Sequence, residues 1–163
     1  MPKEADTRPA ELEARNQYLA TVDDAWEVYR EAVERAWEVY ERSLEDPRRG
    51  YEEAQVAAQE AHGTAIDAAW AEYKQAVANA PSTMRRDVVA QARAVYNEAA
   101  AQIRKQYNES LAIAREDYLR NVSEARRSYQ AAVDQQLEAH RESVRSALAS
   151  YLELVDAESL PPL

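Results

Sequence analysis

Ten tyrosines and two histidines recur along this chain of 163 residues at a fixed step of eleven residues. They form two series: Tyr18, Tyr29, Tyr40, Tyr51, His62 and Tyr73, then Tyr96, Tyr107, Tyr118, Tyr129, His140 and Tyr151. A column of phenol and imidazole rings can relay electrons, line a groove for an aromatic or apolar ligand, or bind a metal or haem through imidazole. The spacing and the neighbouring residues decide which of these chemistries the column can support.

The two histidines are the only candidate metal or haem ligands in the column. His62 and His140 would lie about 60 Å apart along one helical hairpin, so they cannot share a metal within one chain. The Glu-x-x-His pattern of di-iron bundles is missing, because Gln59 and Leu137 stand three residues before them. An antiparallel dimer would bring His62 near His140 of its mate, which leaves an interchain metal or haem site as an alternative. We favour the simpler interpretation, in which each histidine fills a tyrosine position and no cofactor is bound.

Enzymatic motifs are missing from the rest of the chain. The chain has no cysteine and only two glycines, and we find neither a glycine-rich nucleotide loop nor a serine nucleophile with a histidine partner. A tyrosine that recurs in a helical column is usually a core residue whose hydroxyl binds a serine, a carbonyl or water at the rim. The sequence therefore predicts a non-enzymatic protein without catalytic residues, in which the twelve rings form the core.

The period of the column indicates its secondary structure. Eleven residues over three helical turns give about 3.67 residues per turn, which predicts a straight or gently right-handed coiled coil. We letter the repeat a to k from the tyrosine. Positions d and h then hold mainly alanine and serine, and position e holds mainly aliphatic residues. Small residues beside each ring allow a second helix to approach closely, so the column is expected to lie in a narrow seam between helices.

Breaks in the pattern set the expected boundaries. The sequence Thr7-Arg8-Pro9 is typical of a helix start. The step from Tyr73 to Tyr96 is one residue longer than two repeats. The segment from Asn79 to Thr83 contains a proline and candidate helix-capping residues. Pro47 leaves the eleven-residue phase intact, so a kinked helix is favoured over two helices there. The predicted elements are a tail (1–8), a first helix (9–79), a turn (80–83), a second helix (84–156) and a carboxy-terminal tail (157–163).

The two series match each other at an offset of 78 residues, which indicates an internal duplication. A short connection between two such helices makes them antiparallel neighbours, so the fold class is an all-α helical hairpin. If the chain folds back about residues 81 and 82, the numbers of facing residues add up to about 163. This register predicts three contacts at position i: Trp37 with Arg126, Trp70 with Arg93, and Trp26 with Leu137.

Additional apolar residues indicate self-association. Trp26 and Trp37 at position i, with Val28 and Val39 at position k, extend the apolar arc beyond what one partner helix can cover. We therefore expect a homodimer, a four-helix bundle whose interface contains these four residues.

The distribution of charge limits the possible partners. The net charge is −10. Residues 1–81 hold 9 Lys or Arg against 18 Asp or Glu, and residues 82–163 hold 11 against 12. Nucleic acid is not expected as a partner, because phosphate binding requires a clustered basic face. The polar amino-terminal sequence and the lack of a long apolar run predict a cytoplasmic protein without a signal peptide or membrane span.

Three functions remain after these exclusions, and a structural scaffold that mediates self-association or spacing is favoured. The eleven-residue period resembles that of apolipoproteins and phasins, which implies an alternative role as a coat on lipid or polymer granules. Lysines usually flank such lipid-facing helices, whereas this chain has only Lys3, Lys74 and Lys105. The metal- or haem-binding bundle is the third possibility. The segment 160–163, Leu-Pro-Pro-Leu, is a candidate for docking a partner protein.

Overall fold

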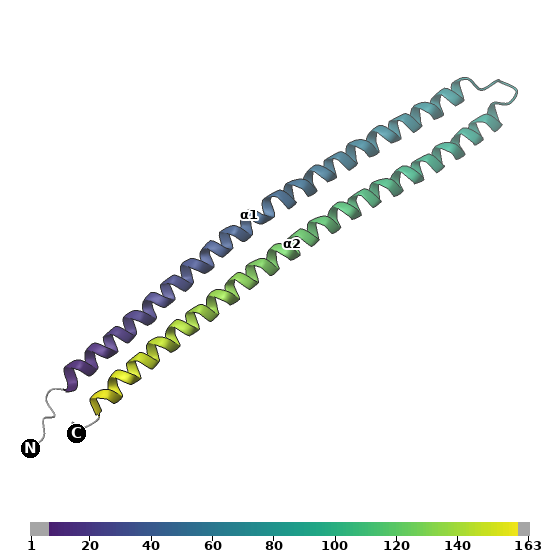
Figure 1. Cartoon of the computed structure of the whole chain (residues 1–163). Coiled ribbons are helices and arrows are strands. Elements are labelled where there is room, and N and C mark those ends of the chain that lie inside the picture. Colours follow the sequence, from purple (N-terminus) through teal and green to yellow (C-terminus); the bar gives the residue numbers. More distant parts are fainter. Residues whose placement is uncertain (1–6, 160–163) are drawn as a thin grey trace, which may run out of the picture. The chain divides into compact units, whose positions relative to one another are not determined.

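A computed structural model describes residues 7–159, with the side chains of residues 9–155. It contains two helices, α1 (Thr7–Ala78) and α2 (Arg85–Ser159), which form an all-α hairpin (Figure 1). Within the described range only residues 79–84 lie outside the helices, and they form the connection. The predicted segment 160–163 lies outside the described residues.

The chain divides into two compact units. The terminal unit consists of Met1–Arg42 and Ala125–Leu163, and the turn unit consists of Ser43–Glu124. Each unit therefore contains a part of α1 and a part of α2, and each is described separately below.

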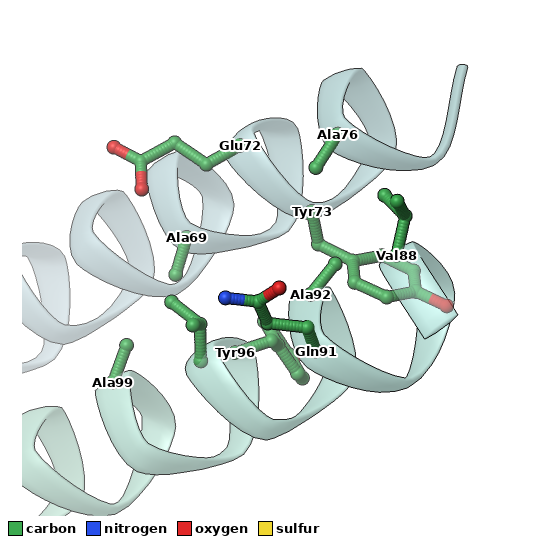
Figure 2. Close-up of a pocket in the computed structure, with 10 residues that line it drawn as sticks. Ala69, Glu72, Tyr73, Ala76, Val88, Gln91, Ala92, Tyr96 and Ala99 are labelled. Carbon is green, nitrogen blue, oxygen red and sulfur yellow. The ribbon is translucent and has the colours of Figure 1, made fainter. Parts of the chain in front are cut away.

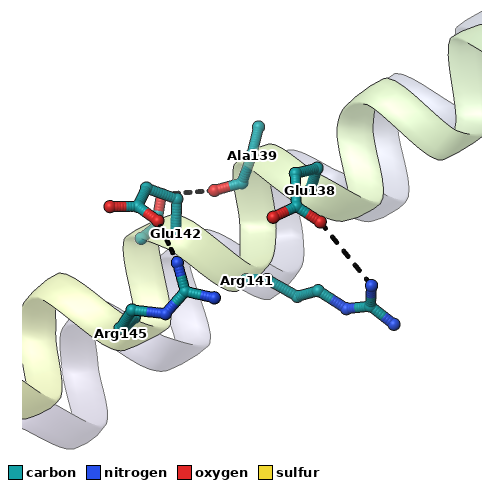
Figure 3. Close-up of polar contacts among 6 residues, drawn as sticks. Glu138, Ala139, Arg141, Glu142 and Arg145 are labelled. Carbon is teal, nitrogen blue, oxygen red and sulfur yellow. Dashed lines mark hydrogen bonds and ion pairs between the residues drawn. The ribbon is translucent and has the colours of Figure 1, made fainter.

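The helices are stabilised locally by ion pairs between residues three or four positions apart. Examples are Arg35 with Glu31 at 3.4 Å and Lys105 with Glu109 at 3.8 Å. Figure 3 shows a stretch of α2 in which Arg141 pairs with Glu138 at 3.6 Å. Each such exposed pair contributes only a few tenths of a kcal/mol. The described residues show no ion pair between α1 and α2, so the contact between the helices depends on their apolar seam.

Helix α1 continues through Pro47, although proline has no backbone N–H to donate. Proline inside a helix costs about 3 kcal/mol relative to alanine. Tyr40 and Tyr51 lie on either side of Pro47 in the same eleven-residue phase, so contacts with α2 on both sides hold the segment helical.

Backbone hydrogen bonds define the turn. The Asn79 amide donates to the Gln75 carbonyl at 3.0 Å, which closes the last turn of α1. The Met84 carbonyl accepts the amide of Val88 at 3.0 Å, so α2 begins directly after Met84. Asp87 lies in the first turn of α2, where a carboxylate interacts favourably with the helix dipole.

Burial in the seam is incomplete. Among the described side chains only Ala14 is classed as buried, at 9% exposure. All twelve column residues are half-buried. Two helices thus form a defined contact but do not enclose a core, because a single partner helix covers only one side of each ring.

Candidate functional site

The structure arranges the twelve column residues as six ring pairs, each joining α1 to α2. The terminal unit holds three pairs with ring centroids 5.5 to 5.7 Å apart: Tyr18–Tyr151, Tyr29–His140 and Tyr40–Tyr129. The turn unit holds three more with centroids 5.1 to 5.9 Å apart: Tyr51–Tyr118, His62–Tyr107 and Tyr73–Tyr96. These separations are typical of favourable aromatic contacts, so the ring pairs join α1 to α2 in both units.

Each tryptophan adds a third ring to one of these pairs. In the turn unit, Trp70 stacks on Tyr73 at 5.1 Å and lies edge-on to Tyr96 at 5.6 Å. The two tryptophans of the terminal unit also contact the tyrosine three residues later and lie edge-on to a ring of α2, but they are tilted to that tyrosine by 33° and 44°. The resulting three-ring clusters are Trp26–Tyr29–His140, Trp37–Tyr40–Tyr129 and Trp70–Tyr73–Tyr96.

The tryptophans make ring contacts that the sequence did not predict. Trp26, Trp37 and Trp70 contact His140, Tyr129 and Tyr96, each three residues further along α2 than the predicted neighbours Leu137, Arg126 and Arg93. The paired column rings depart further from the predicted register. The residue numbers of every ring pair add up to 169. The expected value was 163.

The direction of helical side chains explains this displacement. The helix ends Ala78 and Arg85 have numbers that add up to 163, so the backbone turns where the sequence predicted. A long helical side chain leans toward the amino terminus of its own helix. In an antiparallel pair the two rings therefore lean in opposite directions, and rings that meet belong to backbone positions that are not level. Counting residues from the turn neglects this lean.

The two histidines lie in different units and contact different rings. His62 packs against Tyr107 in the turn unit, and His140 packs against Tyr29 and Trp26 in the terminal unit. The Nδ1 atom of His140 is buried without a hydrogen-bond partner among the described residues. No group of three or more His, Cys, Asp or Glu side chains gathers in a metal-binding arrangement within the described part of the chain.

Shallow grooves follow the seam on the side of the small residues. Figure 2 shows the groove nearest the turn, where Tyr73 and Tyr96 lie among small residues of both helices. The Gln91 carboxamide points into the space between the helices, whereas the Glu72 carboxylate points away from it (Figure 2). The groove is lined by Ala69, Glu72, Tyr73, Ala76, Val88, Gln91, Ala92, Val95, Tyr96 and Ala99. Apart from the Glu72 carboxylate, which points away, these residues provide mainly apolar contact and no metal ligand set.

The four residues predicted for the dimer interface lie on two flanks of α1. Trp26 and Trp37 contact the ring column and are 54% and 46% exposed, whereas Val28 and Val39 are 61% and 60% exposed. Residues two positions apart in a helix are separated by about 160° around its axis. No single surface of this helix therefore presents both the tryptophans and the valines.

A larger set of exposed apolar side chains lies on the tryptophan flank. At positions i, b and f, within about 65° of arc, the terminal unit exposes Leu12, Leu19, Trp26, Trp37, Leu148 and Leu152, and the turn unit exposes Val56, Trp70 and Leu119. We call this surface of each unit its indole face. Among the described side chains of the two helices, only five large exposed apolar residues occupy the opposite side: Val28, Val39, Val95, Ile113 and Leu154. The indole face was not predicted from the sequence, although positions b and f of the repeat contain Val56 and all of its leucines except Leu148, which is at position i.

Comparison with protein-family models finds no matching family, and comparisons with curated proteins and with solved structures find no similar protein. Neither described helix is long and apolar enough to cross a membrane. The arrangement of the side chains is therefore the basis for assigning a function.

Proposed function

We propose that this protein is a non-enzymatic structural scaffold that self-associates through its helical hairpin as a homodimer. The incomplete burial of the ring column is the observation that carries this proposal. The six ring pairs specify how α1 and α2 meet, yet every ring stays half-buried. Further helices packed on the hairpin would cover this remaining apolar surface, as in a four-helix bundle.

The polar surface also supports a scaffold. Each of the eight ion pairs among the described residues joins two residues of the same helix, and both partners of each pair are more than half exposed. Such pairs solubilise a helix and support it locally without forming a reaction centre. The grooves along the seam contain mainly alanine, serine and tyrosine, which suit helix packing.

The two alternative functions, a granule coat and a metal or haem bundle, would give different results in the same set of measurements. A coat on lipid or polymer granules would float with phospholipid vesicles or bind polymer droplets, and it would change its helicity on binding. A metal or haem bundle would contain stoichiometric metal or show a Soret band after purification, and His62→Phe with His140→Phe would abolish it.

Sedimentation equilibrium, vesicle flotation and elemental analysis on one preparation test the proposal. We expect a dimer at tens of micromolar, no flotation and no stoichiometric metal. A monomer at that concentration contradicts self-association. Flotation or stoichiometric metal in the unmodified protein would instead favour the coat or the metal-binding bundle.

A further inference from the structure

Four arginines of α2 occupy position i of consecutive repeats, beside the ring column. They are Arg93, Arg104 and Arg115 in the turn unit and Arg126 in the terminal unit. None of them forms an ion pair with a described carboxylate. Elsewhere on α2, Arg120 at position c pairs with Asp117 and Arg145 at position f pairs with Glu142, whereas Arg127 at position j forms no ion pair with a described residue. The four arginines at position i are thus a continuous basic row without a described carboxylate partner.

Helix α1 carries the opposite charge on its indole face. Its position f holds Asp23 and Glu34 in the terminal unit and Glu45 and Asp67 in the turn unit. None of these carboxylates forms an ion pair with a described residue. Position f lies about 65° from the tryptophan position, so carboxylates and indoles share one surface. Over positions i, b and f, α1 of each unit carries three carboxylates against two cations among the described side chains, whereas α2 carries three or four arginines and at most one carboxylate. The indole face of each unit therefore has a more acidic, indole-bearing half on α1 and a basic half on α2.

We propose that the indole face binds a second copy of the chain, with α1 of one copy lying over α2 of the other. This inference rests on the proposed self-association and identifies the surface that carries it. Apolar side chains of both copies are covered, as a stable interface requires. Arg93 and Arg126 are then level with Trp70 and Trp37 of the opposite α1, which allows arginine to stack on indole, and the arginine row lies over the more acidic helix. Arg115 is level with Arg48, whose charge is already paired with Glu52.

The distribution of charge also selects the orientation. Two hairpins can stack on this face about a twofold axis in two ways. An axis parallel to the helices places α1 over α2 of the mate and brings the two turns together. An axis perpendicular to the helices turns the second copy end over end, so that α1 lies over α1 and α2 over α2. The second arrangement sets arginine columns against each other and acidic columns against each other, which is unfavourable. The first arrangement is therefore selected.

This orientation excludes the pairing of His62 with His140 of the mate. In the selected arrangement each residue of one copy lies level with the same residue of its mate. His62 of one copy is then level with Tyr107 of the other, its ring partner within one hairpin. His140 belongs to the other unit. The dimer thus places Tyr107 of the mate, and not His140, level with His62, so the pair of His62 with His140 of the mate does not form.

Matched charge reversals test the surface. The face variant combines Arg104→Glu, Arg115→Glu and Arg126→Glu. The control combines Lys105→Glu, Arg120→Glu and Arg127→Glu, which lie at positions j and c on the outer surface of the same helix and change the net charge equally. We expect the dissociation constant of the face variant to rise at least about 100-fold and that of the control to change less than about threefold. Circular dichroism verifies that both variants retain their helicity. Equal effects in the two variants would overturn the assignment.

The opposite flank provides a second control. Val28→Glu with Val39→Glu alters the side of α1 away from the tryptophans, and we expect this variant to remain dimeric. If it becomes monomeric while the face variant stays dimeric, the interface lies on the valine flank and the inference is wrong. If the unmodified protein is itself monomeric at tens of micromolar, the proposed function fails together with this inference.

Spin labels test the orientation independently of the charge variants. The chain contains no cysteine, so Ser82→Cys gives a single labelled site in the turn. Packed helices lie about 8 to 10 Å apart, so the two labelled turns of the proposed dimer should show one short distance in dipolar electron paramagnetic resonance. A dimer whose labels show no short distance would be the end-over-end arrangement and would refute the proposed orientation.

Discussion

Inserting one alanine after Ala99 is the sharpest test of the ring column. The insertion lies in α2 between Tyr96 and Tyr107, and it rotates every later residue of the helix by about 100°. Of the nine ring contacts between α1 and α2, seven involve residues beyond Ala99. Only the two contacts of Tyr96, with Trp70 and Tyr73, retain their phase.

The loss can be estimated from these contacts. Aromatic pairs contribute roughly 0.5 to 1.5 kcal/mol each beyond simple burial, so seven contacts represent about 3.5 to 10 kcal/mol. A single-turn π-bulge can absorb an extra residue and recover part of this energy. We therefore expect the insertion to lower the free energy of unfolding by at least about 3 kcal/mol, a large share of the roughly 5 to 15 kcal/mol typical of folded proteins.

Urea unfolding followed by circular dichroism at one protein concentration measures this change. The first control adds the same alanine between Ser82 and Thr83 in the turn, where it disturbs no ring pair, and should cost less than about 0.5 kcal/mol. The second control combines the insertion after Ala99 with deletion of Ala112, which leaves only the His62–Tyr107 pair out of phase and should restore most of the stability. A loss below about 1 kcal/mol for the single insertion would refute the column as the main contact between the helices.

Three substitutions give further tests, each read from the urea midpoint. A Cβ added at Gly50 meets nothing within 4 Å, so Gly50→Ala should stabilise the protein by about 1 kcal/mol, and a lower midpoint would contradict an ordinary helical backbone there. Pro47→Ala should stabilise it by about 1 to 3 kcal/mol, because it restores a backbone donor inside α1; no gain would show that the proline is already accommodated. His140→Phe removes a buried nitrogen without a partner and should be neutral or stabilising by about 1 kcal/mol, whereas a loss above 1 kcal/mol would indicate that His140 makes a polar interaction essential to the fold.

Much of the fold is predictable from the spacing of one residue type. Tyrosines at a fixed step indicate helices, and the longer step between Tyr73 and Tyr96 indicates where they reverse. The hairpin class is confirmed by α1 and α2. Their ends were predicted to within three residues, because propensity changes gradually near Pro9 and Asp156 while tertiary contacts decide where a helix stops.

The contacts within the seam were less predictable. The lean of a helical side chain depends on its length, so counting residues from the turn identified the right helix for Trp70 but not its ring partner Tyr96. The sequence-based prediction also placed Trp26 and Val28 in one interface, because they are close in sequence. In the helix they point to different sides. Charges are visible in the sequence, but the missing carboxylate partners of Arg104 and Arg115 become apparent only once the ion pairs of α2 are known.

The positions of the ring pairs imply an order of folding. Tyr73 and Tyr96 are separated by 23 residues, whereas Tyr18 and Tyr151 are separated by 133. Closing the longer loop in a flexible chain would cost about 1.6 kcal/mol more than closing the shorter one. If the pairs form successively from the turn, each new pair adds only eleven residues of each helix to a structure that already exists. The hairpin is thus expected to close from the turn toward the termini, and the amides around Tyr18 and Tyr151 should exchange their hydrogens first when it opens.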